Sequence, residues 1–176
     1  MIKAFNNSIQ RFDLALILYI SQLNGRRISD RLFYLVSKIG DGHLYVLIGI
    51  FLMFASVQGS IKILYAGLLA FAIELPVYFI VKKYVKRKRP FEQIENFRKL
   101  IVPPDKYSFP SGHTAAAFVM ASVFSFVFPI FSALLYFLAS LIGFSRLYLR
   151  VHYPTDILAG CLLGILSAKF SLWIIF

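Results

Sequence analysis

Three short segments of this sequence combine the residue types that bind phosphate with those that transfer it. In chain order they are Lys82 with Arg89-Pro90, then Pro110-Ser111-Gly112-His113, and then Ser145-Arg146 with His152 and Asp156. Phosphoryl transfer spreads negative charge over three oxygens, so a protein contributes mainly positioning and electrostatic stabilisation. The three segments supply two histidines, three cations, two hydroxyls and a carboxylate for that purpose. They predict one site that removes phosphate from a substrate.

The cations and the second segment are suited to holding the phosphate oxygens. Arginine presents a planar fork to two oxygens and lysine acts as a point charge, so Lys82, Arg89 and Arg146 are predicted to bind phosphate. Ser111 is predicted to cap a helix whose first backbone N–H groups attract the anion. Gly112 would let a phosphate oxygen approach the backbone.

The two histidines are predicted to differ in role because only one has a carboxylate at helical spacing. His152 and Asp156 are four residues apart and share a face at the start of a helix. The carboxylate would accept the proton of one imidazole nitrogen and leave the other free to attack phosphorus. His152 is therefore the predicted nucleophile, and His113 is left to protonate the leaving oxygen. No metal or cofactor is predicted, since no cluster of carboxylates and histidines resembles a two-metal site.

The composition places this site in a membrane protein. Hydrophobic residues make up 59% of the 176 and charged residues 15%, against about 25% charged in a soluble domain. The mean hydropathy is +0.74. Five apolar runs are long enough, or nearly so, to cross about 30 Å of hydrocarbon as helices: 43–57, 61–81, 114–128, 130–149 and 155–176. The predicted fold is an all-α integral membrane bundle of five to six helices, forming one domain over residues 1–176.

The N-terminal segment has a different pattern. Apolar residues recur at near-helical spacing from Phe5 to Tyr19, while Asn7, Arg11 and Asp13 interrupt any long apolar run. This pattern is typical of a helix that lies in the headgroup layer. A short transmembrane span over residues 14–23 is the alternative, which its length of about 10 residues disfavours.

The spans also bring the three segments together. If 61–81 and 114–128 are consecutive spans, the basic segment 82–110 lies at one membrane face. Two further spans return residues 146–156 to the same face. An odd number of crossings would have placed His113 and His152 on opposite faces, so the spacing supports both the topology and the chemistry.

Taken together, the segments resemble the complete three-part signature of the type 2 phosphatidic acid phosphatase family. The resemblance implies a metal-independent phosphatase with a phosphohistidine on His152, His113 as the acid and Asp156 orienting the nucleophile. It implies phosphate binding by Lys82, Arg89, Ser111, Gly112 and Arg146. Short bacterial members of the family act on phosphatidylglycerophosphate, undecaprenyl diphosphate or lipid A 1-phosphate.

Further cations surround the signature and bear on the substrate. Arg87, Lys88, Arg98 and Lys99 are predicted to contact a lipid headgroup. Segment 91–107 is predicted to form either a short amphipathic helix at the lipid surface or a loop anchored by its apolar residues. This basic rim suits a large headgroup with several negative charges, which ranks lipid A 1-phosphate first. Undecaprenyl diphosphate, phosphatidylglycerophosphate and a phosphotransferase reaction are the alternatives. The predicted partner is thus a membrane lipid and no nucleic acid.

The charge pattern leaves the membrane orientation open. In the predicted topology all but Lys62 and Lys169 of the 19 lysines and arginines lie on the active-site side. The positive-inside rule would place that side in the cytoplasm. The resemblance implies the outer side of the bacterial inner membrane, which is the predicted location, because catalysis and an anionic headgroup account for many of the cations.

Glu74 is the residue whose role the sequence leaves undecided. An ionisable group within a span is costly, which makes it a candidate functional residue. The alternative is a protonated or hydrogen-bonded side chain beside the kink expected at Pro76.

Overall fold

The computed structural model describes residues 2–54 and 59–176, with side chains from residue 8 onward. Its described residues form helices and connecting segments, and they contain no strand. The helices are α1 (Ile2–Ser21), α2 (Arg27–Ile39), α3 (His43–Phe54), α4 (Ser60–Val85), α5 (Pro90–Gln93), α6 (Gly112–Val127), the 3₁₀ turn η1 (Pro129–Phe131), α7 (Ser132–Tyr148) and α8 (Pro154–Ile175). The predicted all-α fold is confirmed.

Each of the five predicted apolar runs contains a helix. Three stretches of the described chain are long and apolar enough to span a membrane: Ser60–Gln93, Pro129–Tyr148 and Pro154–Ile175. Helices α2 and α3, bent by 42° relative to one another, would together make a fourth. Helix α6 is apolar but shorter, with 16 residues. Large apolar side chains such as Phe137, Leu162 and Trp173 are exposed, as expected for a bundle surrounded by lipid.

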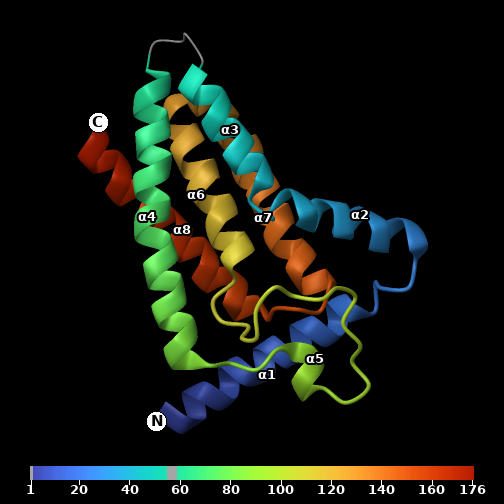
Figure 1. Cartoon of the computed structure of the whole chain (residues 1–176). Helices are drawn as coiled ribbons and strands as arrows, with labels where there is room; N and C mark the ends of the chain where they lie inside the picture. The colour runs from blue at the N-terminus through green and yellow to red at the C-terminus, as the bar shows by residue number, and fades with distance from the viewer. Residues whose placement is uncertain (1, 55–58) are drawn as a thin grey trace.

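Helix α6 occupies the centre of the bundle and packs against α4, α7 and α8 (Figure 1). Two glycines of α8 allow the closest of these contacts. A Cβ atom on Gly164 would lie 2.3 Å from the carbonyl oxygen of Ala115, and one on Gly160 would lie 2.5 Å from that of Ser111. Small residues of this kind let helix backbones approach in a membrane. The packing therefore holds the start of α6 against the start of α8, where two of the signature segments lie.

Helix α1 lies across one end of the bundle, beneath α4 and α8 (Figure 1). Ile17 and Ile20 are buried against the bundle, whereas Phe12 and Tyr19 are exposed. Helix α1 is not among the helices long and apolar enough to span a membrane. Its position agrees with the prediction of a helix in the headgroup layer.

Segment 91–107 is a loop and not the amphipathic helix that was one of the two predictions. After the four residues of α5, Ile94 is extended and Asn96 has a positive φ of 59°. Phe97 is buried in a cluster with Ile17 and Tyr153. The loop is therefore held by its apolar side chains against α1 and the start of α8, which is the alternative that the sequence left open.

Candidate active site

The signature residues converge at one end of the bundle, although they come from different elements. Lys82 lies in the last turn of α4 and Arg89 directly precedes α5. Ser111, Gly112 and His113 form the start of α6, and Arg146 lies in the last turn of α7. His152 precedes α8, and Asp156 lies in its first turn. Arg89, Gly112, His113, Arg146 and His152 all line one cavity of about 820 Å³.

The start of α8 places a carboxylate near the predicted nucleophile. Pro154 is the first residue of the helix, and Asp156 accepts a hydrogen bond from the backbone N–H of Tyr153 at 2.8 Å. The same carboxylate lies near the imidazole, with Oδ2 of Asp156 3.6 Å from Nδ1 of His152. Its Nε2 is then directed toward the cations, 3.4 Å from Nη1 of Arg89. The 3.6 Å contact is too long for a hydrogen bond, and Nδ1 has no hydrogen-bond partner among the described residues, so the orienting hydrogen bond expected from Asp156 is not formed here. Nε2 is the ring nitrogen that lies toward the cations.

The surroundings of His152 favour its neutral form. The residue is 2% exposed. Burial, followed by the positive charges of Arg89 and Arg146, lowers the pKa of His152 well below its ordinary value. A neutral imidazole carries the lone pair that a nucleophile needs.

The two arginines keep donors free for a ligand. Nη1 of Arg146 donates a hydrogen bond to Oγ of Ser37. Nε and Nη2 of the same side chain are buried without a hydrogen-bond partner among the described residues. Arg89 donates from Nη1 to the carbonyl oxygen of Val151 at 2.6 Å, while its Nε has no partner in the part of the chain that the structure describes. Buried donors of this kind are costly unless a ligand satisfies them.

The start of α6 is built as the sequence predicts, with one difference. Oγ of Ser111 accepts a hydrogen bond from the N–H of Thr114 at 3.4 Å, which caps the helix. Gly112 is explained first by packing, because a Cβ atom there would lie 2.9 Å from the ring of Tyr78. The absence of a side chain at this position thus lets α4 approach the helix start.

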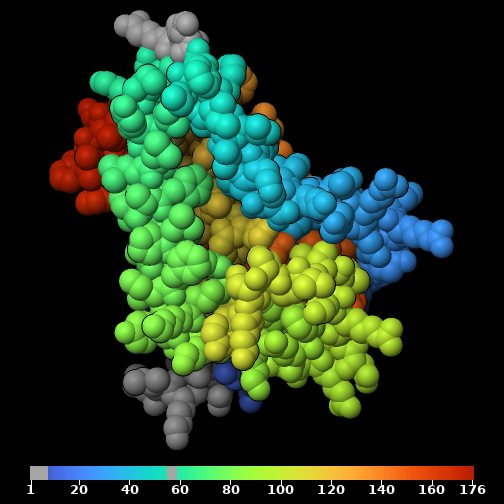
Figure 2. Space-filling model, viewed as in Figure 1, coloured from blue at the N-terminus to red at the C-terminus, as the bar shows by residue number. Residues whose placement is uncertain are grey.

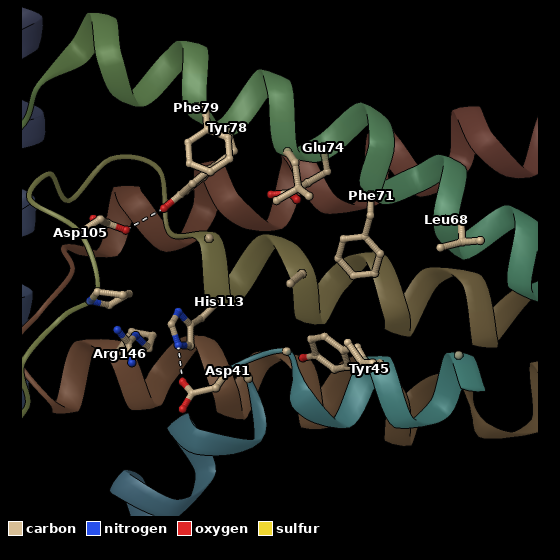
Figure 3. A pocket seen from close by; sticks show the side chains of 18 of the residues that line it. Asp41, Tyr45, Leu68, Phe71, Glu74, Tyr78, Phe79, Asp105, His113 and Arg146 are labelled. Atoms are coloured by element: carbon tan, nitrogen blue, oxygen red, sulfur yellow. Dashed lines mark hydrogen bonds and ion pairs between the residues drawn. The ribbon is translucent and has the colours of Figure 1, made fainter. Parts of the chain in front are cut away.

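His113 has a carboxylate partner that the sequence did not reveal. Its Nε2 lies 2.8 Å from Oδ1 of Asp41, in the turn between α2 and α3 (Figure 3). The inference that His113 lacks a carboxylate rested on local spacing, and Asp41 is 72 residues away. The only available signal was the Gly40-Asp41-Gly42 turn ahead of α3. Both histidines are therefore paired with an aspartate.

Asp105 is a second site residue that the sequence pattern did not reveal. Its carboxylate is bound to two of the predicted phosphate-binding cations. Its carboxylate accepts from Nζ of Lys82 at 2.8 Å and from Nη2 of Arg89 at 2.7 Å. The hydroxyl of Tyr78 donates to it at 2.8 Å (Figure 3). Burial alone would raise the pKa of Asp105, but Lys82, Tyr78 and Arg89 lower it to about 2. A charged carboxylate thus lies where phosphate oxygens are expected to bind.

Arg87 is not placed as a headgroup contact. Its guanidinium group forms ion pairs with Asp156 at 2.8 Å and with Asp13 at 2.5 Å, and both carboxylates are fully buried. Asp13 also accepts hydrogen bonds from the N–H and the hydroxyl of Thr155. Arg87 therefore links α1 to the first turn of α8 and holds Asp156. The predicted headgroup role of Arg87 is therefore corrected, since sequence position alone does not show which cations turn inward.

The other predicted headgroup residues remain at the surface. Lys88, Arg98 and Lys99 are exposed. Lys99 and Lys38 line a second cavity of about 500 Å³, which also reaches His113 and Arg146. The catalytic end of the bundle is thus approached by two cavities, one largely apolar and one with a basic edge.

The fold and this site define a helical membrane protein in which three separate segments meet at one candidate site. The PAP2 superfamily matches residues 60–176, and the chain belongs to this superfamily. The resemblance predicted from the sequence is confirmed.

Known proteins resemble this chain in structure and in sequence. The crystal structure of Aquifex aeolicus LpxE superposes with a TM-score of 0.80 at 30% identity and covers 92% of this chain and 95% of its own. An undecaprenyl-diphosphatase of Sulfolobus acidocaldarius is 28% identical over 158 residues, which are 89% of this chain and 73% of that protein. A lipid A 1-phosphatase of Porphyromonas gingivalis is 39% identical over 71 residues, 38% of this chain and 16% of that protein. Several further relatives are longer, and the chain spans 50% to 63% of their length.

Proposed function

We propose that this protein is a lipid phosphatase whose substrate enters the site sideways from the bilayer. The observation that carries the proposal is the larger cavity, which runs from His113, Arg146 and His152 along an apolar groove between α3 and α4. Figure 2 shows this groove as a hollow between the two helices, with α6 behind it. Its walls include Val46, Ile50, Leu64, Leu68 and Phe71. A groove of this composition fits hydrocarbon chains, and its end fits their phosphate.

The proposed reaction proceeds in two transfers. Nε2 of His152 attacks phosphorus, forming a P–N bond while the P–O bond to the lipid breaks. His113 gives its proton to the departing oxygen and then takes one from a water molecule, which hydrolyses the phosphohistidine and releases phosphate. Asp156 keeps the imidazole of His152 oriented, and Lys82, Arg89 and Arg146 stabilise the charge on the transferred group.

Substrate binding requires Asp105 to move from its present partners. Its carboxylate forms ion pairs with Nζ of Lys82 and Nη2 of Arg89, the donors that would bind the phosphate. A phosphate monoester carries up to two negative charges and presents three oxygens, so it competes well for those donors. Asp105 belongs to the loop between α5 and α6, and this loop is the element that would shift.

Among lipids we propose lipid A 1-phosphate first, in the bacterial inner membrane with the site on its outer side. The smaller cavity with Lys38 and Lys99 offers room and positive charge for a large anionic headgroup beside His113. Undecaprenyl diphosphate and phosphatidylglycerophosphate are the alternatives, since the relatives of this chain include an undecaprenyl-diphosphatase and a phosphatidylglycerophosphatase as well as a lipid A 1-phosphatase.

The test is phosphate release by the purified protein in detergent, with each of the three lipids and with EDTA present. No three His, Cys, Asp or Glu side chains are grouped to hold a metal within the described residues. Activity with at least one lipid, absent in His152→Ala, would support the proposal. A wild-type protein that releases phosphate from none of the lipids would contradict it.

A further inference from the structure

Two polar side chains that line the apolar groove each have an oxygen without a hydrogen-bond partner among the described residues. Glu74 of α4 is 1% exposed, and its Oε2 has no hydrogen bond within the described part of the chain. The hydroxyl of Tyr45, on α3, is likewise buried and unpaired among the described residues. Both residues line the groove. In Figure 3 they lie on opposite walls, between the phosphate end at His113 and the apolar end at Leu68.

Their depth below the phosphate site follows from the helix geometry. Glu74, Tyr78 and Lys82 are spaced four residues apart and lie along one face of α4. The hydroxyl of Tyr78 already reaches the phosphate-binding group, because it accepts from Nζ of Lys82 at 2.5 Å. One further turn, about 6 Å along the axis, separates Tyr78 from Glu74. Glu74 therefore lies a few covalent bonds below the phosphorus of a bound lipid.

An unpaired carboxyl oxygen and an unpaired hydroxyl are costly at this depth. Hydrocarbon offers no hydrogen bonds, so intramembrane polar groups normally find partners within the protein or face a functional path. The neighbouring side chains do not supply such partners: Tyr45 stacks on Phe71, and the remaining walls of the groove at this level are apolar. The missing partner is best supplied by the molecule that fills the groove.

We propose that Glu74 and Tyr45 hydrogen-bond to the polar linkage where the chains of the substrate begin. The ligand class is an acylated lipid phosphate, with an amide, ester or hydroxyl group a few bonds from phosphorus. A polyprenyl diphosphate has only hydrocarbon beyond its phosphates and gains nothing from the pair, so the pair favours the acylated lipid over it. This inference rests on the proposed lipid phosphatase function and narrows its substrate. Glu74 and Tyr45 are specificity residues, since neither takes part in the phosphoryl transfer.

The experiment compares Glu74→Leu and Tyr45→Phe with the wild type on three substrates. These are lipid A, undecaprenyl diphosphate and a water-soluble phosphate ester without chains. Removing a hydrogen bond to a buried polar group should raise KM for lipid A about tenfold. KM for the other two substrates should stay within about twofold, because they offer Glu74 and Tyr45 nothing to bind.

A matched control is Tyr136→Phe, which removes a hydroxyl that donates to Oγ of Ser122 at 3.0 Å, away from the groove. It should leave the preference between substrates unchanged. Tyr45→Phe retains the ring and its stacking, so it keeps the test valid even where Glu74→Leu fails to fold. Equal losses on all three substrates, no loss on any, or a wild type that prefers undecaprenyl diphosphate would overturn the inference. A wild type inactive on every lipid would instead contradict the proposed function.

Discussion

At the scale of single residues, the site pairs each histidine with an aspartate and surrounds both with cations. His152 faces Asp156, and His113 faces Asp41. The first pair could be predicted because its members are four residues apart at the start of one helix, with His152 just before α8 and Asp156 in its first turn. The second could not, because a residue 72 positions away becomes a neighbour only through packing. Burial, and after it the neighbouring positive charges, lower the pKa of His152, so its neutral form persists below the usual titration range near pH 6.5.

The first prediction concerns the nucleophile. His152→Ala should abolish turnover and the acid-labile phosphoenzyme, because no other imidazole has its Nε2 directed at the cations in this way. Asp156→Asn should leave a slower enzyme, by about 10²-fold or more, since the imidazole loses its orienting carboxylate. Rapid quenching with radiolabelled lipid phosphate measures both quantities. Normal phosphate release from purified His152→Ala would refute the assignment.

The second prediction concerns Asp105, whose carboxylate competes with phosphate for Lys82 and Arg89. Asp105→Asn removes the negative charge and should lower the inhibition constant of vanadate about tenfold, because a charged competitor has gone. The pKa of about 2 means that this competition persists through the whole working pH range of the wild type. Glu95→Gln, an exposed acid on the same loop, is the control and should change nothing. Weaker vanadate inhibition in Asp105→Asn would mean that the carboxylate positions the cations.

At the scale of elements, the first turn of α8 is held by a helix that the PAP2 superfamily match does not reach. The match begins at residue 60, yet Asp13 of α1 binds both Arg87 and Thr155. The sequence predicted α1 as a surface helix from its spacing of apolar residues. In that pattern Asp13 is only a polar interruption, and its partners could not be predicted. Through Arg87, which pairs with both Asp13 and Asp156, α1 is linked to the carboxylate of the first turn of α8.

The third prediction tests this support. Arg87→Met leaves two buried carboxylates, Asp13 and Asp156, without their cation. Removing one partner of a buried ion network costs about 3–5 kcal/mol, so the melting temperature should fall clearly. The maximal rate should fall too, because Asp156 loses a hydrogen bond. Thermal unfolding in detergent and steady-state kinetics measure the two effects.

The neighbouring cation provides the control for Arg87. Lys88→Met changes an exposed side chain and should leave both stability and maximal rate near the wild type. Adding Asp13→Asn to Arg87→Met should recover part of the stability, because one unpaired charge is then removed. If Arg87→Met raised only the KM for lipid, Arg87 would be a headgroup contact after all.

At the scale of the whole molecule, the sequence predicted the bundle and the convergence of three segments on one end. Both followed from the length of the apolar runs and from an even number of crossings. The loop between α5 and α6 was less predictable, since its apolar residues fit a helix as well as a packed loop. The structure has a loop there, in which Asn96 has a positive φ and Phe97 is buried. Which cations face inward was equally hidden, because Arg87 and Lys88 are adjacent in sequence and opposite in environment.

The last prediction belongs to the basic rim, now reduced to the exposed cations Lys88, Arg98 and Lys99. If they attract an anionic headgroup, changing all three to glutamine should raise KM for the lipid several-fold and leave the maximal rate nearly unchanged. The salt dependence of KM should weaken as well, because attraction between exposed charges is screened beyond about 8 Å at physiological ionic strength. A water-soluble phosphate ester carries no large headgroup and should respond much less. An equal loss of maximal rate with both substrates would mean that these cations support the geometry of the site, and the preference for a highly charged headgroup would lose its physical basis.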